Sequence, residues 1–379
     1  MKERAFLDFY DQINKVPVSQ GNAGSSQHFT QRTSLYRTLG ITPLMVKGRD
    51  VLEVGPGSGD NALHIASWLP NSIRFVDGAR ASVNSIETKI EQGVYGLNAD
   101  IIYQDVSLSP VKGQFDVVLF EGLLPGQEHP KVFLNNVLTT VKPGGVAVFT
   151  TVSAVSYLSE ICRRVLLPLV KKNLKNQDEL MPTLINLFQP SFDSLSGMTR
   201  KHEDWILDNI IHDWTNNGLF TIEDALKALP ENFSILSTSP NFLQDWRWYK
   251  EADKSNVTYS NSYHVWSGYL LDYRSQPEKT FSINESYLLE KLSQNAMVIH
   301  DRFRNTSSFE HLGEFIICLE QISELVSDKM PETSQSIVDF IHGIEKLKIG
   351  DIAADFSSFH QWFGRGQQYI SVVKDYNDE

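Results

Sequence analysis

A glycine-rich turn with an acidic residue in front of it is the feature of this sequence best suited to chemistry. Residues 51–60 read VLEVGPGSGD, so Glu53 stands two positions before Gly55, and Gly57 and Gly59 follow at alternate positions. Glycine adopts positive φ without strain and leaves no Cβ between backbone and ligand, while a helix that follows offers unpaired N–H donors. The turn therefore predicts a ligand held against the backbone. The carboxylate of Glu53 would repel a pyrophosphate, and it suits a cationic amino-acid group.

Three further carboxylates stand where predicted strands end. Asp77 lies about 22 residues after Gly55, where a carboxylate can accept hydrogen bonds from both hydroxyls of a ribose. Asp105, which Val106 follows, comes directly after the next strand, and Glu121 comes directly after the fourth. An isolated acid at a strand end is also a common helix cap or solvated loop residue, so the hypothesis depends on their joint occurrence. Glu121 is interpreted either as a second carboxylate of the ligand pocket or as the cap of its turn.

A parallel sheet is needed to bring these residues together. Between about residues 48 and 151, short apolar runs alternate with longer mixed stretches, which is typical of repeated strand–helix units. We predict strands at Asp50–Val54, Ile73–Asp77, Ile101–Gln104, Phe115–Phe120 and Val146–Thr151, and helices at Asn61–Trp68, Ala81–Gln92 and His129–Val141. The turn at 142–145, which reads KPGG, is expected to end the last of these helices. Two later runs, Phe233–Ser239 and Val265–Leu271, are expected to close the sheet as an antiparallel hairpin.

In order and spacing these residues resemble the class I S-adenosylmethionine (SAM)-dependent methyltransferases, over roughly residues 48–151. The resemblance implies a Rossmann-like α/β fold, with a mostly parallel sheet and an antiparallel terminal hairpin, and SAM as cofactor. It also implies roles for the site residues: Glu53 near the methionine amino group, Gly55, Gly57 and Gly59 beneath the cofactor, Asp77 at the ribose, Asp105 at the adenine amino group and Val106 against the ring. Glu121 is a candidate cofactor-binding or catalytic carboxylate, either near the sulfonium or in the acceptor pocket, unless it only caps its turn. A nicotinamide-dependent oxidoreductase is the rival at the level of the fold, but its G-x-G-x-x-G turn has a different spacing.

The methyl acceptor is expected where the fourth strand ends, because ligands lie beyond the carboxyl ends of parallel strands. Residues 121–126 read EGLLPG and lack the [N/D]-P-P-[Y/F] motif of the related DNA and glutamine N-methyltransferases. We expect the helical insertion at about 153–230 and the segment 245–249 to form the acceptor pocket, with His212 as a candidate base near Trp214 and Trp246. The other candidate bases are His28, His129, His202 and His264.

The rest of the chain is predicted to be helical. Residues 1–47 are interpreted as an N-terminal helical lid, residues 48–274 as the SAM-binding domain with its insertion, and residues 275–379 as a C-terminal helical domain. Further helices are predicted at 155–172, 179–187, 203–214, 222–229, 285–302, 309–327, 334–348 and 353–363. The C-terminal helices are expected to serve stability or the formation of a homo-oligomer.

Composition limits the partners and the compartment. The formal net charge of −12 repels phosphate backbones, so no nucleic-acid partner is expected. The basic residues of one predicted helix, Arg163 and Arg164 among them, are interpreted as a solvated face. No run approaches the about 20 apolar residues of a membrane span, and the first residues lack the apolar core of a signal peptide, so we expect a cytoplasmic protein without a membrane partner. No metal signature is present, and the two cysteines are expected to be buried thiols: Cys162 and Cys318.

The sequence thus favours SAM-dependent methyl transfer to an oxygen or nitrogen atom of a small-molecule or saccharide-like acceptor. A protein methyltransferase that holds its substrate with the C-terminal helices is one alternative. A noncatalytic scaffold or assembly partner with a SAM fold is another. The intact set of Gly55, Gly57, Asp77 and Asp105 argues against decay of the site.

Overall fold

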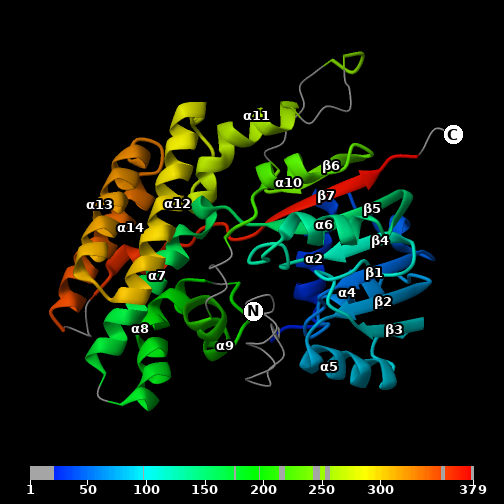
Figure 1. Cartoon of the computed structure of the whole chain (residues 1–379), viewed down its shortest axis with the longest axis horizontal. Coiled ribbons are helices and arrows are strands. Elements are labelled where there is room, and N and C mark those ends of the chain that lie inside the picture. The colour runs from blue at the N-terminus through cyan, green and yellow to red at the C-terminus, as the bar shows by residue number, and fades with distance from the viewer. Residues whose placement is uncertain are drawn as a thin grey trace. The chain divides into compact units, whose positions relative to one another are not determined.

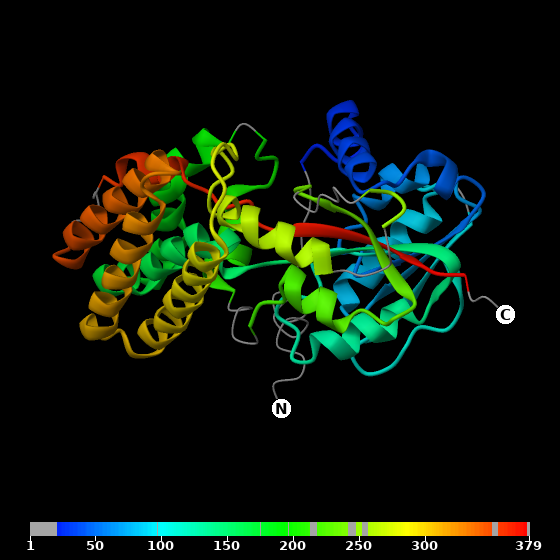
Figure 2. The same cartoon turned by 90° about the horizontal axis from the view of Figure 1, so that it is seen from above.

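The chain forms two compact units, each assembled from separate stretches of sequence. The sheet unit comprises residues 1–152, 214–260 and 367–379, and the helical unit comprises residues 153–213 and 261–366. Figure 1 and Figure 2 show the elements of both units. The computed structural model describes residues 21–96, 98–174, 176–195, 197–212, 218–241, 248–251, 257–350 and 355–376.

Seven strands make up the sheet of the described residues. They are β1 (Asp50–Val54), β2 (Ser72–Asp77), β3 (Asn98–Tyr103), β4 (Phe115–Phe120), β5 (Val141–Thr151), β6 (Phe233–Ser239) and β7 (Gln368–Lys374). Their order across the sheet is β3-β2-β1-β4-β5-β7-β6. Strand β7, red in Figure 1, runs antiparallel to both of its neighbours, whereas β1 to β5 pair in parallel. The predicted Rossmann-like fold, mostly parallel with an antiparallel end, is confirmed.

The central strands β1 and β4 are mostly apolar because both faces of a parallel sheet are normally covered. All residues of β4 except Asp116 are buried. Strand β1 pairs with β2 on one side and with β4 on the other, so the order of the strands reverses between β1 and β4. Such a reversal is where an open parallel sheet leaves a crevice for a ligand at the carboxyl ends of its strands.

Short helices connect the strands of the sheet unit. Helix α2 begins where the Ser25 side chain accepts a hydrogen bond from the backbone N–H of His28. His28, Arg32 and Tyr36 recur every four residues, which places them on one face of α2, and all three are buried. The helices are α2 (Ser26–Thr38), α3 (Pro43–Val46), α4 (Ala62–Ala66), α5 (Arg80–Glu91), α6 (Pro130–Leu138) and α10 (Ile222–Ala228).

Two sequence predictions about the sheet are wrong. Val265–Leu271 is not a strand: it contains the end of helix α11 (Val257–Trp266) and the 3-10 helix η4 (Ser267–Leu271). A short apolar run does not by itself distinguish a strand from a buried helix. The antiparallel partner of β6 is instead β7, which lies in the range that was expected to be wholly helical.

The segment expected to be a turn before the fifth strand lies inside β5. Strand β5 begins at Val141, and residues 142–145 continue it although Gly144 has a φ of 73°. The pairing of β4 with β5 shifts its register between Phe115 and Val117. The glycines therefore produce a bulge, which leaves the strand unbroken.

The helical unit contains helices from both the predicted insertion and the predicted C-terminal domain. Helix α13 contacts α12 and α14, and the three helices run side by side in Figures 1 and 2. A capping box between Ser282 and Glu285 starts α12, and Pro331 occupies the first turn of α14. The elements are α7 (Ala154–Asn173), η1 (Gln177–Glu179), α8 (Leu180–Ser194), α9 (His202–Ile206), the π-helical turn η2 (Leu207–Ile211), η4, α12 (Ile283–Thr306), α13 (Phe309–Val326), α14 (Pro331–Lys348) and η5 (Ser357–Gln361).

Helix α7 is the core of this unit and corrects the interpretation of its basic residues. Arg163 and Arg164 are fully buried, so they do not form a solvated face. Arg163 donates to the carbonyl oxygen of Trp362, and its guanidinium lies 3.8 Å from the ring centroid of Phe363. Arg164 donates to the carbonyl oxygen of His212. Backbone acceptors and aromatic faces replace the water that these cations would otherwise need. The two cysteines are buried and free, as predicted.

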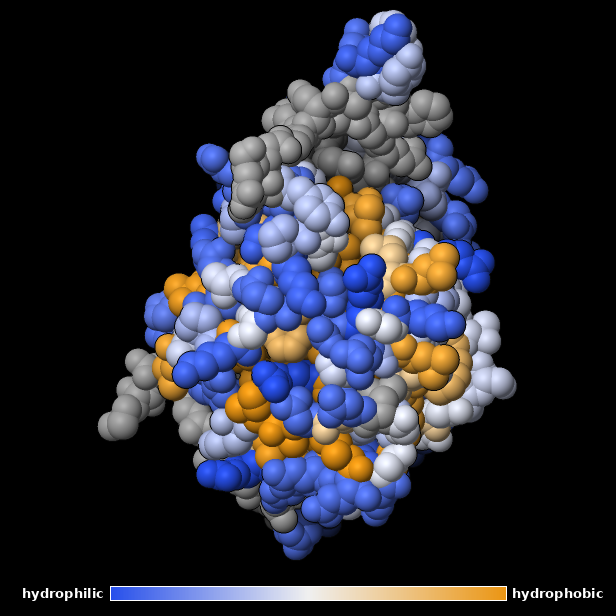
Figure 3. Space-filling view, turned by 90° about the vertical axis from the view of Figure 1, so that its right-hand side faces the viewer, coloured by the Kyte–Doolittle hydropathy of each residue, from blue (hydrophilic) through white to orange (hydrophobic). Residues whose placement is uncertain are grey.

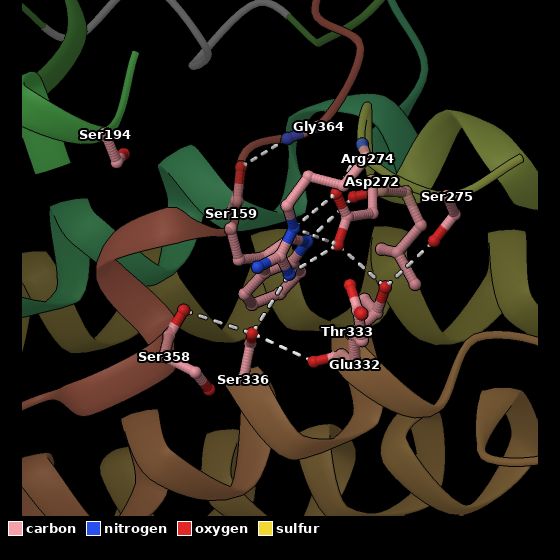
Figure 4. A network of polar contacts seen from close by, with 12 residues as sticks. Ser159, Ser194, Asp272, Arg274, Ser275, Glu332, Thr333, Ser336, Ser358 and Gly364 are labelled. Atoms are coloured by element: carbon pink, nitrogen blue, oxygen red, sulfur yellow. Dashed lines mark hydrogen bonds and ion pairs between the residues drawn. The ribbon is translucent and has the colours of Figure 1, made fainter.

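A buried carboxylate organises a second polar network of the helical unit (Figure 4). Asp272 has no exposed surface and forms a bidentate ion pair with Arg274. It also accepts a hydrogen bond from the hydroxyl of Thr333, and Arg274 donates to the hydroxyl of Ser336 on α14. The chain after η4 is thereby tied to the start of α14.

One face of the molecule is predominantly polar. Figure 3 shows hydrophilic residues across one face of the molecule, with apolar residues in smaller separate groups. Among the residues that the structure describes, no helix combines the length and the apolar character that a membrane crossing requires.

Candidate functional site

The predicted site residues of the first and fourth strands meet at the point where the strand order reverses. Glu53 of β1 is in register with Leu119 of β4, two residues before Glu121. Gly55 directly follows β1, and Glu121 directly follows β4. Because the two strands are parallel, these residues lie at the same edge of the sheet. The structure therefore brings the glycine turn and both carboxylates into one place.

The glycine turn has the backbone conformation that its sequence predicts. Gly55, Gly57 and Gly59 have φ values of 66°, 56° and 73°, which only glycine adopts without strain. A Cβ on Gly55 would come within 2.6 Å of the Leu123 side chain, in the segment after β4, and a Cβ on Gly59 would overlap Tyr95. Packing within the protein thus requires glycine at both positions, in addition to any ligand above the turn.

Glu121 is held by an ion pair that the sequence analysis missed. Arg32 of α2 donates from Nη1 to Oε2 of Glu121 at 2.8 Å and from Nη2 to Oε1 at 2.7 Å. The hydroxyl of Tyr36 donates to the same Oε1 at 2.7 Å. Burial alone would raise the pKa of Glu121, but the charge and hydrogen bonds of Arg32 lower this pKa below its ordinary value. Glu121 is therefore a paired anion, and a proton acceptor of this kind is a weak general base.

Glu53 differs from Glu121 in its hydrogen bonds and in its pKa. Its side chain is partly exposed, but its Oε2 atom is buried and has no hydrogen-bond partner among the described residues. Burial, followed by the charge of Glu121, raises the pKa of Glu53 to about 8, although Arg32 opposes this rise. A carboxyl group in this state can bind a cationic group that compensates its charge.

The predicted ribose and adenine residues lie at the ends of the next two strands. Asp77 is the last residue of β2 and is buried, and its Oδ1 accepts from the backbone N–H of Ala79 at 2.8 Å. Asp105 follows β3 and accepts from both the N–H and the hydroxyl of Ser107. Val106 is 3% exposed. These contacts shape the two turns, while the proposed contacts with ribose and adenine stay predictions.

Buried polar and aromatic side chains connect α2 with α4, the helix that follows the glycine turn. His64 of α4 shares a hydrogen bond with Thr33 and stacks on Tyr36 at 5.6 Å between ring centroids. His28 shares a hydrogen bond with Asn61, which precedes α4. Burial, with a contribution from the charge of Arg32, lowers the pKa of His64 to about 4, so His64 is a neutral packing residue at pH 7. The four-residue spacing of the buried residues in α2 is the signal that could have identified this face.

The residues expected at the acceptor are described only in part. His212 is buried at the end of η2 in the helical unit, where its carbonyl oxygen accepts from Arg164. Trp214 and Trp246 lie outside the described residues. Among the other candidate bases, His264 shares a hydrogen bond with Tyr287, His202 stacks on Phe192, and His129 precedes α6. The role of His212 as a base stays a prediction.

Comparison with known proteins gives a sequence match and remote structural likenesses. Residues 27–194 match a family model described as a methyltransferase domain. No curated protein sequence matches the chain.

Three solved structures illustrate the structural likeness. The DhpI-SAM-HEP complex is similar at 22% identity, with a TM-score of 0.30, over 40% of this chain and 65% of that chain, so this chain spans less than two thirds of its length. PKMT2 from Rickettsia typhi in complex with AdoHcy matches at 15% identity and a TM-score of 0.38, over 59% of this chain and 45% of that one. The [4+2]-cyclase SpnF matches at 13% identity and a TM-score of 0.40, over 99% of this chain and 97% of that one.

The sequence match covers α2, the glycine turn and the strands that carry the paired carboxylates. It therefore includes Glu53 and the ion pair between Arg32 and Glu121. Residues 27–194, which include the glycine turn after β1 and most of the parallel strands, are therefore similar to a methyltransferase domain.

Proposed function

We propose that this enzyme transfers the methyl group of SAM to an oxygen or nitrogen atom of a small-molecule or saccharide-like acceptor, at the carboxyl ends of β1 and β4. The observation that carries the proposal is the buried Oε2 of Glu53 beside the glycine turn, for which the described part of the chain offers no hydrogen-bond partner. A buried carboxylate without a partner is costly to a fold and marks a ligand site when it lies at the end of a parallel strand.

The residues of the sheet unit fit the cofactor. When bound, SAM supplies a methyl group that its sulfonium already makes electrophilic. Glu53 would hold the ammonium of the methionine portion, and the glycines would let the backbone approach it. Asp77 would accept from the ribose hydroxyls, and Asp105 with Val106 would bind the adenine. The main task of the protein is then to orient donor and acceptor for in-line transfer.

The net charge of the chain supports a small-molecule acceptor, and the ion pair of Glu121 determines the role that we assign to this residue. The net charge of −12 disfavours a polyanionic substrate. Both oxygens of Glu121 already accept hydrogen bonds from Arg32, so we assign Glu121 a positioning role and retain His212 as the proposed base.

Calorimetric titration with SAM and, separately, with NAD tests the cofactor. We expect SAM to bind at about 1–100 μM and NAD not to bind. Gly57→Val should abolish SAM binding with the fold mostly intact, because a branched side chain disfavours the φ of 56°. A folded protein that binds no SAM at millimolar concentration would contradict the proposal.

Release of S-adenosylhomocysteine across a panel of hydroxylated and amino small molecules, with protein substrates in a parallel panel, tests the acceptor. Turnover of a small molecule is the expected result. Turnover of proteins alone would favour a protein methyltransferase, and SAM binding without turnover of either panel would favour the noncatalytic scaffold.

A further inference from the structure

Glu53 and Glu121 share the carboxyl edge of β1 and β4, but among the residues that the structure describes only Glu121 forms an ion pair. Glu121 accepts two charge-assisted hydrogen bonds from Arg32 and a third bond from Tyr36. The exposed fractions of the paired side chains are 10% for Arg32 and 16% for Glu121. This pair is shielded from water, and it keeps Glu121 ionised.

Glu53 lies on the strand beside the one that leads to Glu121, and its electrostatics include the negative charge of Glu121. Its Oε2 has no hydrogen-bond partner among the described residues, and no salt bridge to Glu53 is found there. Two carboxylates near one another in a shielded site do not both ionise readily, and a single cation compensates only one of them. The direction of the pKa of Glu53, raised by burial and by Glu121, agrees with this geometry.

The charged and titratable groups around Glu53 come from several elements. Tyr95 carries a raised pKa, caused first by burial and then by the charge of Glu53. Tyr36 likewise has a raised pKa, to which Glu53 contributes. The groups are Arg32 and Tyr36 of α2, Tyr95 after α5 and Glu121 after β4. Of these only Arg32 is a cation, and Glu121 already occupies it.

We infer that Glu53 is a neutral carboxylic acid in the cofactor-free protein and gives up its proton to solvent when the ammonium group of SAM binds beside it. Arg32 and Tyr36 act as positioning residues in this step, because they hold Glu121 as the fixed negative charge that keeps Glu53 protonated. The inference rests on the proposed cofactor site. The ammonium keeps its own protons and compensates the carboxylate that the departing proton leaves behind.

Titration calorimetry with S-adenosylhomocysteine, which carries the same ammonium group, measures the released proton. The heat of binding is recorded at pH 7 in phosphate and in Tris, whose ionisation enthalpies differ, for the wild type and for Glu53→Gln. Protons that the ligand itself exchanges are common to both proteins. We expect the wild type to release nearly one proton more than Glu53→Gln. Equal proton release in the two proteins would overturn the inference.

The variant Glu121→Gln tests whether the charge of Glu121 keeps Glu53 protonated or whether Glu121 has only a structural role. This change removes the like charge and leaves Arg32 to attract Glu53, so Glu53 should already be ionised at pH 7. The expected proton release is then less than half that of the wild type, and the pH at which release is greatest should fall. Release identical to that of the wild type would contradict the role of Glu121.

Infrared spectroscopy covers the case in which Glu53→Gln binds too weakly for calorimetry. Cofactor-free wild type at pH 7 should show a protonated carboxyl band that the ligand abolishes and that Glu53→Gln lacks. Absence of this band would overturn the inference even though the ligand binds. Failure of wild type to bind the ligand at all would instead contradict the proposed function, so the two failures are distinguishable.

Discussion

Replacing Glu53 with glutamine should stabilise the cofactor-free protein while weakening its affinity for SAM. Burial and Glu121 raise the pKa of Glu53 from 4.5 to about 8 in the folded chain, whereas the unfolded chain has the ordinary value. Between these pH values the folded state binds more protons than the unfolded state, so the free energy of unfolding falls as pH rises. Glutamine does not titrate, so a protein with glutamine at this position does not lose stability in this way as pH rises.

The size of the gain follows from the distance between the ordinary pKa and the working pH. About 2.5 pH units separate 4.5 from pH 7, and at about 1.4 kcal/mol per unit the penalty reaches at most about 3.4 kcal/mol. The Glu53 side chain is partly exposed, and a glutamine amide must itself find partners. We therefore expect Glu53→Gln to raise the free energy of unfolding at pH 7 by about 1–2 kcal/mol.

Urea denaturation at pH 5 and pH 7, followed by circular dichroism, measures this difference. The gain in the free energy of unfolding should be larger at pH 7 than at pH 5. At pH 5 the pH is only slightly above 4.5, the pKa of the glutamate in the unfolded chain, so the penalty that glutamine removes is small. Glu91→Gln, at an exposed position in α5, is the matched control and should show no such pH dependence. A Glu53→Gln protein with no gain at pH 7, or with the same gain at both pH values, would refute the reasoning.

Three further changes test other contacts. Asp77→Ala should weaken SAM binding at least tenfold, because a charge-assisted hydrogen bond contributes about 1.5–3 kcal/mol; unchanged affinity by calorimetry would leave Asp77 as a turn residue. Arg32→Met should lower the free energy of unfolding at pH 7 by about 3 kcal/mol, since it leaves Glu121 buried without its cation. Because the pKa of Glu121 is lowered in the fold, this loss, measured by urea denaturation, should fade as pH falls below about 4.3, and a loss independent of pH would contradict the ion pair. Asp272→Ala should cost about 3–5 kcal/mol by leaving Arg274 without its carboxylate, and scanning calorimetry that finds a loss under about 1 kcal/mol would contradict the importance of this pair.

The sequence predicted those parts of the fold that depend on local pattern. The apolar runs of β1 and β4 and the positive φ of the glycine turn follow from residue type over a few positions, and both predictions were confirmed. The hairpin partner could not be found in this way. An apolar stretch of seven residues suits a strand or a buried helix equally well, and only pairing with β5 and β6 distinguishes β7 from Val265–Leu271.

Within the site, the turn and its acids were predictable but their electrostatic partners were not. Arg32 and Glu121 are 89 residues apart, and no local pattern connects a helix of the N-terminal segment with the end of β4. The burial of Arg163 and Arg164 was missed for a related reason. Their guanidinium groups donate to the carbonyl oxygens of Trp362 and His212, which are far away in the chain, and sequence alone does not show these acceptors.

The late position of β7 has a consequence for synthesis on the ribosome. Val146 of β5 pairs with Val373, and β6 reaches the sheet only through β7. Until residues 368–374 have left the exit tunnel, β5 is an open edge and β6 has no partner, although the cofactor turn is complete much earlier. An unpaired parallel edge of this kind invites pairing with another chain. We therefore expect nascent chains stalled before residue 368 to need a chaperone or to aggregate, because the pairing of β5 and β6 with β7 forms only after this point.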